Sequence, residues 1–514
     1  MFSENSCGSN AFNMICEVQG TETRIILTED EVSIYFTHST QTVPLSHILA
    51  VELKNEDGQT ETQTTLCLHY AQPGSQCRLY KQQLSIMGQR DECEFFQKQI
   101  SNSIKKSSRP KRLLIFVNPN SGKKRAMKIF NKYAAPLFQI CGIQSEMIVT
   151  SRPKQPTEKL QACNLVGMDG IVTVGGDGLF CECLNALLIR AQKDAGRDYD
   201  DPDVTLRRPS LPIGIIPAGS GDVMAQYLHG TRDATTAVLK ILLGDVVAMN
   251  SVGVYENKLT SYSGLILGFG LFGDMMKDCE KYRWMGPARY NIIPLGTILK
   301  RRTVDIDFEY LPADSKGTIQ AGRRHFRRQF SAPGFRNVPP TPARQNSTPE
   351  CIKISTTTKG WKKTDGRVYA VDTYAVSLGP EAGKLKPHFG DNAMSAILTD
   401  KCKLSKHMAQ LTKLQKHQPD CYNYSFIRHF RVMAYRVRLL HARTKTTEDG
   451  SRLVHKKHYF NCDGEAIQLT RPEFEVSTFC IPDYTESVYI CLEASYTEKA
   501  HESSCYTKNM LWVI

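Results

Sequence analysis

Short apolar runs alternate with amphipathic segments between residues 113 and 217. We expect strands at residues 113–117, 145–150, 171–174 and 211–217, and helices up to residue 138 and at 155–165 and 179–190. A fully apolar run such as 113–117 is typical of a parallel strand that is buried on both faces. This alternation predicts a doubly wound α/β domain that binds its ligand at the carboxyl ends of the strands.

The N-terminal part of the chain has a different pattern. Runs at residues 23–27, 32–36 and 65–70 are separated by polar turns, and residues 92–105 carry apolar side chains at roughly helical spacing. Several strands followed by one amphipathic helix predict a small antiparallel β module that resembles a pleckstrin-homology (PH) domain. A protein-binding or purely structural β module is the alternative.

Short strands with long polar insertions follow residue 245, and they predict a β-rich second domain, which we expect to be a β-sandwich. Residues 313–350 are rich in Arg, Pro, Ser and Gly and contain a basic cluster at 323–328, so we expect a mobile insertion there. The domain boundaries that we predict are 1–105 for the PH-like module, 106–245 for the α/β domain and 246–514 for the β-rich domain.

Three of the expected strands end in turns of small residues. The turns are Asn118, Pro119, Asn120, Ser121 and Gly122; Gly175, Gly176, Asp177 and Gly178; and Gly219, Ser220 and Gly221. Glycines at a strand end let backbone N–H groups face a phosphate. Neither a P-loop nor a dinucleotide fingerprint is present, because Lys124 stands where a P-loop needs Ser or Thr and the glycine spacing is wrong for a dinucleotide site.

Asp177 is the unusual residue among these turns, since phosphates repel a carboxylate. Such a carboxylate binds a metal, orients a hydroxyl nucleophile or accepts its proton, so Asp177 indicates phosphoryl transfer. The alternative is an aspartate that only caps a helix.

Together the three turns resemble the lipid kinase family that contains diacylglycerol, sphingosine and ceramide kinases. The resemblance covers about residues 111–311 and resumes at 461–465. It implies that Asp177 activates the lipid hydroxyl and that Gly175, Gly176 and Gly178 lie beside the substrate. It also implies nucleotide binding by Asn118, Pro119, Asn120, Ser121, Gly122, Thr150, Glu182, Gly219, Ser220 and Gly221.

Residues 267–274 and 277–290 resemble the ceramide kinase branch of this family. The resemblance implies that Arg283 and Arg289 contact the nucleotide phosphates, although surface arginines on a helix are the alternative. It also places Asp274 and Met276 at the lipid. Sphingosine kinases have an acid where this chain has Met276, and a buried acid facing a neutral amide would lack a counter-ion. Met276 therefore favours an N-acylated lipid, unless it only fills the core.

Asp463, Gly464 and Glu465 match a late acidic turn of the family. The resemblance implies a nucleotide-binding role, with Asp463 and Glu465 near Mg²⁺ or its waters; a simple β-turn is the alternative. Two departures are visible: Asp222 stands where many relatives have asparagine, and residues 313–401 lack the cysteine cluster of ceramide kinases.

The formal charge of +13 favours an acidic partner, such as nucleotide phosphates or an anionic membrane surface. Nucleic acid is not expected, because the chain has no RNA-binding signature or zinc-finger spacing. Seventeen cysteines are scattered without a CxxC pair, which favours reduced thiols in a cytoplasmic protein. We expect no signal peptide, and any membrane contact, at an internal or the plasma membrane, is expected to be peripheral.

The sequence thus predicts a kinase that uses ATP and Mg²⁺ to phosphorylate the primary hydroxyl of ceramide, with phosphoinositide as a candidate ligand of the N-terminal module. A sphingosine or diacylglycerol kinase and a catalytically silent lipid-binding relative stay open as alternatives.

Overall fold

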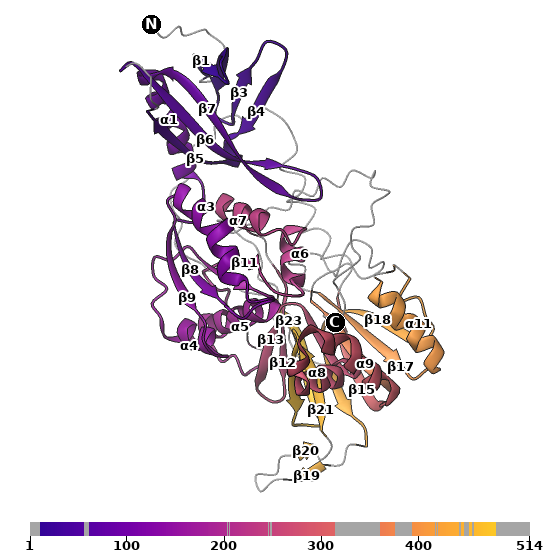
Figure 1. The fold of residues 1–514 in the computed structure, drawn as a ribbon. Coiled ribbons are helices and arrows are strands. Elements are labelled where there is room, and N and C mark those ends of the chain that lie inside the picture. The colour runs from indigo at the N-terminus through magenta and orange to yellow at the C-terminus, as the bar shows by residue number, and fades with distance from the viewer. Residues whose placement is uncertain are drawn as a thin grey trace.

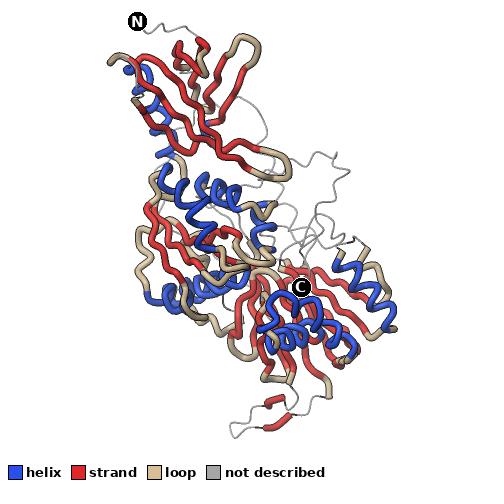
Figure 2. Tube along the Cα trace, in the orientation of Figure 1, coloured by secondary structure: helices blue, strands red, loops and turns tan. Residues whose placement is uncertain are grey.

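The computed structural model describes residues 11–55, 61–313, 360–375 and 393–479, apart from 203, 205, 245, 247, 248, 417, 419, 442, 443, 447–451, 455 and 456. Three large β-sheets follow one another along the chain, helices lie on each of them, and two further strands form a small separate sheet (Figures 1 and 2). The expected insertion at 313–350 lies almost wholly outside the described residues. No helix in the described part is long and apolar enough to cross a membrane.

The N-terminal sheet contains seven antiparallel strands in the order β4-β3-β2-β1-β7-β6-β5. The strands are β1 (Phe12–Val18), β2 (Thr21–Leu27), β3 (Glu31–Tyr35), β4 (Thr40–Pro44), β5 (Ile48–Lys54), β6 (Gln63–Pro73) and β7 (Leu79–Gln89), with a 3₁₀ turn η1 (Leu45–His47) and the helix α1 (Arg90–Lys106). Alternate residues of β1 are buried, as a strand with one core face requires. Cys93, Phe96 and Ile100 of α1 complete the core of this sheet.

The second sheet is fully parallel, with the order β11-β10-β8-β9. Its strands are β8 (Arg112–Val117), β9 (Gln144–Val149), β10 (Gly170–Gly175) and β11 (Ile213–Pro217). Helices cover both faces: α2 (Ala126–Ile129), the π-helical turn η2 (Phe130–Ala134), α3 (Ala135–Ile140) and α7 (Ala234–Leu243) pack on one, while α4 (Gln155–Ala162) and α5 (Asp177–Asp194) pack on the other. The short helix α6 (Val223–His229) follows β11.

The apolar run of β8 explains this double covering. Leu113, Ile115 and Val117 enter the core under α2, α3 and α7, whereas Leu114 and Phe116 enter the core under α4 and α5. The doubly wound α/β arrangement expected from the sequence is therefore present.

The third sheet has ten strands: β12 (Ser251–Tyr255), β13 (Leu259–Ser263), β14 (Ile266–Gly270), β15 (Val304–Pro312), β16 (Lys362–Tyr374), β17 (Met394–Asp400), β18 (Ile427–Leu439), β21 (His458–Cys462), β22 (Glu465–Leu469) and β23 (Glu473–Phe479). Its helical segments are α8 (Leu271–Lys281), the 3₁₀ helix η3 (Arg283–Ala288), α9 (Arg289–Leu299) and α11 (Leu404–Gln415), and β19 (Thr444–Thr446) pairs with β20 (Arg452–Val454) in a separate hairpin.

The β-rich prediction for this part is confirmed, but the β-sandwich detail is not. Hydrogen bonds join all ten strands into one continuous sheet, because β15 and β17 each pair with both β16 and β18. The predicted domain boundaries and the PH likeness stay predictions.

Candidate active site

Three turns at the carboxyl ends of β8, β10 and β11 meet at one place. A Cβ on Gly122, whose φ is +57°, would lie 2.7 Å from the Ala218 carbonyl oxygen, and a Cβ on Gly219 would lie 2.5 Å from the Cα atom of Gly176. Side chains at Gly122 and Gly219 would therefore collide with the neighbouring turn. The glycines that the sequence singled out allow the turns to touch.

The first turn is held by its own asparagine. The Asn118 backbone N–H donates to Val174 at 3.1 Å, and the Asn118 side-chain oxygen accepts the Asn120 N–H at 3.0 Å. Ser121 is buried at the centre of this turn, while Pro119 is half-buried. The turn is thus fixed against β10, with Asn120 exposed at its rim.

Asp177 lies at the junction of β10 and α5 and is only 8% exposed. Its two carboxylate oxygens accept the backbone N–H groups of Val223, at 3.0 Å, and Met224, at 2.7 Å, which open helix α6. Burial raises the pKa of Asp177, and these two N–H donors oppose the rise. Asp177 therefore caps α6, a helix other than its own, and it lies beside Gly176 and Gly178 at the meeting point of the turns.

Asp222 is a second buried carboxylate beside Asp177. Its backbone is left-handed, with φ +52°, and its Oδ1 atom accepts the Gly219 N–H at 2.9 Å, which closes the turn that includes Ser220 and Gly221. Burial and the charge of Asp177 raise the pKa of Asp222 to about 6. In the sequence Asp222 stood out only as a replacement for asparagine, and its closeness to Asp177 comes from the packing of α6.

Glu182 of helix α5 and Glu465 of strand β22 lie near enough for their charges to interact. Glu182, on α5, accepts a hydrogen bond from Thr157 of α4 at 3.3 Å. Burial raises the pKa of Glu182, and the charge of Glu465, at the start of β22, adds to the rise. Thr150 is 8% exposed just after β9, where its N–H donates to Val117 at 2.9 Å. The late acidic turn is thus brought to the α/β part of the site.

Asp463 has a role that the sequence did not reveal. Its carboxylate accepts the Ser263 hydroxyl at 2.7 Å and the backbone N–H groups of Gly264, Leu265 and Ile266 at 2.8 to 3.0 Å. Both oxygens thus hold the connection between β13 and β14 in place, and a contact of Asp463 with Mg²⁺ or its waters stays a prediction.

The turn around Asp463 is itself well ordered by local bonds. Asp463 and Gly464 have φ values of +51° and +93°, and the Gly464 N–H donates to the Asn461 side chain at 2.8 Å. The charge of Asp463 adds to the rise in the pKa of Asp177, which places this turn near the catalytic candidate. No group of three or more His, Cys, Asp or Glu side chains within the described ranges is arranged to hold a metal ion.

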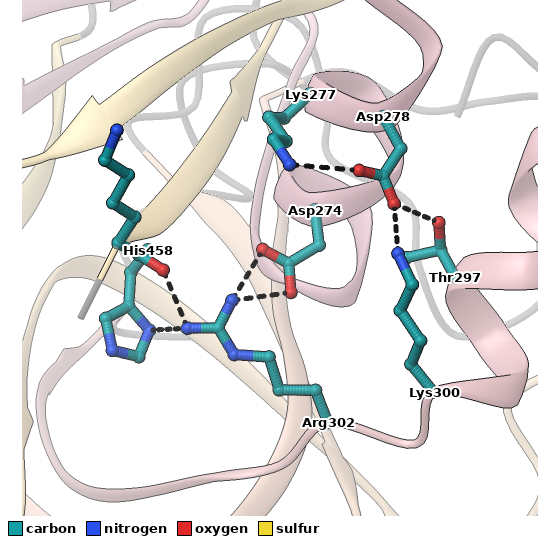
Figure 3. Close-up of polar contacts among 8 residues, drawn as sticks. Asp274, Lys277, Asp278, Thr297, Lys300, Arg302 and His458 are labelled. Carbon is teal, nitrogen blue, oxygen red and sulfur yellow. Dashed lines mark hydrogen bonds and ion pairs between the residues drawn. The ribbon is translucent and has the colours of Figure 1, made fainter. Parts of the chain in front are cut away.

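Helix α8 carries the residues expected to face the lipid, and Figure 3 shows its polar side. Both Asp274 oxygens accept the Nη1 atom of Arg302 at 3.0 Å, and the Nη2 atom of Arg302 contacts His458 at 3.0 Å (Figure 3). Asp278 accepts Thr297 and Lys300, each at 2.8 Å. The acids near Met276 therefore have cationic partners of their own.

Met276 itself is buried, with an exposed fraction of 8%. It carries no charge at the position where sphingosine kinases are expected to have an acid. Burial raises the pKa of Asp274, against the effect of Arg302. Burial also acts against ionisation of Asp278, but hydrogen bonds from Lys300 and Thr297 lower its pKa overall.

The two arginines expected at the phosphates begin η3 and α9, respectively. Arg289 is half-buried, and its carbonyl oxygen accepts the Cys279 thiol at 4.0 Å. The side chain of Arg283 lies outside what the structure describes. Phosphate binding by Arg283 and Arg289 stays a prediction.

A parallel sheet with glycine turns at its strand ends and a buried carboxylate among them defines a phosphoryl-transfer class of fold and site. The diacylglycerol kinase catalytic domain matches residues 112–254, which include all three turns. The chain is 33% identical to mouse ceramide kinase over 73% of this chain and 74% of that protein. It is 30% identical to human ceramide kinase over 85% of this chain and 87% of that protein. The chain belongs to the family of ATP-dependent lipid kinases that includes the ceramide kinases.

A solved diacylglycerol kinase from Bacillus anthracis aligns with a TM-score of 0.41 at 11% identity, over 72% of this chain and 94% of that chain.

Proposed function

We propose that this protein transfers the γ-phosphoryl group of ATP to the primary hydroxyl of ceramide, which yields ceramide 1-phosphate. The observation that carries the proposal is the position of Asp177, a buried carboxylate at the point where three glycine turns meet. The likeness to two mammalian ceramide kinases over most of the chain supports the choice of lipid.

In this mechanism Asp177 orients the lipid hydroxyl and takes its proton while the oxygen attacks the γ-phosphorus and the bond to the β-phosphate oxygen breaks. The N–H groups of Val223 and Met224 fix the Asp177 carboxylate in one orientation. The raised pKa of Asp177 makes it a stronger base than an exposed aspartate. The glycine turns offer backbone N–H groups to the phosphates, and Arg283 and Arg289 complete the charge at the nucleotide.

Mg²⁺ bound with ATP supplies positive charge that neutralises the phosphates. Asp463 and Glu465 are the acids expected near this Mg²⁺ or its waters, and we add Glu182, whose pKa is raised by burial and by the charge of Glu465. A cation near Glu182 and Glu465 would offset the repulsion from Glu465, which adds to the rise that burial causes in the pKa of Glu182.

The substrate preference follows from α8. Met276 presents no charge, and Asp274 and Asp278 are paired with Arg302 and Lys300. The two acids that flank Met276 are therefore already paired and would not be available to an ammonium group, whereas a neutral amide needs no counter-charge. This supports ceramide over sphingosine.

We further infer a peripheral contact with the cytoplasmic face of an internal or the plasma membrane. Ile292, Leu295 and Leu299 are 50% to 58% exposed on α9, and Trp284 of η3 is 81% exposed. The three α9 side chains share one face of their helix, and this exposed apolar face, like Trp284, suits the acyl-chain boundary, while the net charge of +13 favours anionic lipid. The N-terminal sheet with its closing helix α1 is proposed to act as a PH-like module that binds phosphoinositide.

The test is a radiolabelled-ATP assay with ceramide, sphingosine and diacylglycerol in matched micelles, with wild type and Asp177→Asn. We expect ceramide to be phosphorylated fastest, and the variant to lose about 10²- to 10⁴-fold in kcat. Faster turnover of another lipid supports the sphingosine or diacylglycerol alternative, and no turnover by wild type supports a silent relative.

Asp169→Asn is the matched control for this assay. Asp169 also accepts two backbone N–H groups, those of Lys111 at 2.7 Å and Arg112 at 2.8 Å, but at the opposite end of the parallel sheet. Full activity of Asp177→Asn, or an equal loss in Asp169→Asn, would contradict the proposed base.

A further inference from the structure

Asp372 lies on β16 of the large sheet, and one oxygen of its carboxyl group is buried without a hydrogen-bond partner among the described residues. The residue is 4% exposed, and its Oδ1 atom is fully buried without a hydrogen bond from any described residue. Burial raises the pKa of Asp372 well above its ordinary value, which favours the neutral acid. An unpartnered buried acid destabilises a fold, so its presence calls for a functional explanation.

The carboxyl group points to the side of the sheet that helix α8 covers. Gly268 of β14 stands opposite Asp372 in the strand register. A Cβ on Gly268 would lie 3.2 Å from the Asp372 Oδ1 atom and 2.8 Å from the Cβ atom of Phe272, on α8. Phe272 and Met276 are four residues apart and share one face of α8. Asp372 therefore lies close to the helix face that bears Met276.

Neighbouring hydroxyl groups do not bind Asp372, because they bond to one another. Tyr422 donates to Tyr374 at 3.2 Å, and Tyr435 pairs with Thr373 at 2.7 Å. These tyrosines are near enough that the charge of Asp372 contributes to the rise in their pKa values. The hydroxyl groups of Tyr374, Tyr422 and Tyr435 are thus paired with other hydroxyl groups and not with Asp372.

The surroundings of Asp372 are continuous with those of Asp177. Tyr374 packs in one apolar cluster with Val223 and Met224, whose N–H groups bind the Asp177 carboxylate. The side chains of this cluster are buried and packed together, so a lipid that reached from Asp177 toward β16 would have to displace some of them.

We propose that the Asp372 carboxyl group binds a neutral hydroxyl or amide group of the lipid headgroup and contributes to lipid specificity. The inference rests on the proposed function. A neutral acid offers one O–H donor and an acceptor oxygen, which suit the hydroxyl or carbonyl of an N-acylated lipid. Without the lipid, the buried oxygen of this acid has no hydrogen-bond partner, which lowers the folding stability of the protein. We attribute this loss of stability to the lipid-binding role of Asp372.

The experiment compares wild type, Asp372→Asn and Asp372→Leu in micelles with a short-chain ceramide. Asparagine keeps a donor and an acceptor, so kcat/KM is expected to stay within about threefold of wild type, whereas leucine is expected to raise KM at least about tenfold with little change in kcat. Lipid-free Asp372→Leu is expected to unfold at a higher temperature than wild type, because the unsatisfied acid is gone. A purely structural role would not move KM.

Ser477→Ala is the matched control. Ser477 of β23 is 2% exposed and its hydroxyl is also buried without a partner, but it lies on a strand that does not pair with β14 or β16. Its removal is expected to leave KM unchanged. If Asp372→Leu does not fold, Asp372→Ala replaces it under the same criteria.

Binding of a fluorescent short-chain ceramide without ATP separates this inference from the proposed function. If wild type binds ceramide but phosphorylates no lipid, the proposed function fails, and weaker binding by Asp372→Leu still supports the inference. If wild type is an active ceramide kinase and Asp372→Leu keeps both KM and binding affinity, the inference is overturned and the function stands.

Discussion

Replacement of Asp222 by asparagine is expected to stabilise the protein at neutral pH. Asp222 is 8% exposed and lies beside Asp177, and burial and that neighbouring charge raise its pKa from 3.8 to about 6. The folded state therefore holds the Asp222 proton more tightly than the unfolded chain does. A raised pKa of roughly 2 units corresponds to about 3 kcal/mol, which the folded state loses when Asp222 is ionised.

The pH dependence has a definite sign. The destabilisation by Asp222 is fully present above pH 6, shrinks as the pH falls from 6 toward 3.8, and is absent below the unfolded pKa of 3.8. Asparagine is neutral throughout, tolerates the left-handed backbone at φ +52°, and keeps an oxygen for the Gly219 N–H. The variant should therefore gain up to about 3 kcal/mol at pH 7.5 and almost nothing below pH 4.

Amide hydrogen exchange of residues 219–229 measures this effect locally, which suits a chain of several sheets whose global unfolding need not be two-state. We expect slower exchange in Asp222→Asn at pH 7.5, after correction for the intrinsic rate. Asp233→Asn, which alters the cap that accepts the Thr236 N–H of α7 at 2.8 Å, is the control and should give no such gain. Faster exchange in Asp222→Asn at pH 7.5 would refute the reasoning. An equal change in exchange at pH 7.5 and below pH 4 would refute it too.

Three further predictions concern the same site. Gly219→Ala should raise the KM for ATP at least about tenfold, because the added Cβ would lie 2.5 Å from the Gly176 Cα atom; unchanged ATP kinetics would contradict the packing of the turns. Asp463→Ala should lower the local opening free energy of residues 259–270, measured by amide hydrogen exchange, by at least about 3 kcal/mol, since three buried backbone N–H groups lose their acceptor; a loss below about 1 kcal/mol would argue against it. Asp274→Asn should lower stability by about 1 to 3 kcal/mol and raise the KM for ceramide, because Arg302 loses its charged partner; an unchanged melting temperature would show that the pair contributes little.

Much of the nucleotide part of the site could be predicted from local sequence. An apolar strand followed by glycines and a helix is a local pattern, so the turns at Gly122, Gly176 and Gly219 were recognisable one by one. Their meeting could be expected too, because the carboxyl ends of parallel strands share one edge of a sheet. Helix α5 begins at Asp177, two residues earlier than the pattern indicated.

The β-rich part was far less predictable. Its ten strands pair across long separations, and β12 lies beside β23 although more than 200 residues divide them in the sequence. Alternation of apolar and polar residues identifies strands but not their partners, so the sequence could not give the pairing order of the ten strands.

The sequence by itself determined the class of chemistry, because each turn proposed to approach the phosphates is a short local stretch of residues, and the acid lies within one of these stretches. Only the tertiary structure decided what each acid does. Asp177, Asp222, Asp372 and Asp463 are alike as residues, yet one caps α6 at the meeting of the turns, one closes the turn after β11, one lies buried without a partner, and one binds the chain around β13 and β14. The physical reason is that the partners and the solvent exposure of a carboxyl group, which set its charge and its reactivity, come from segments far away in the chain.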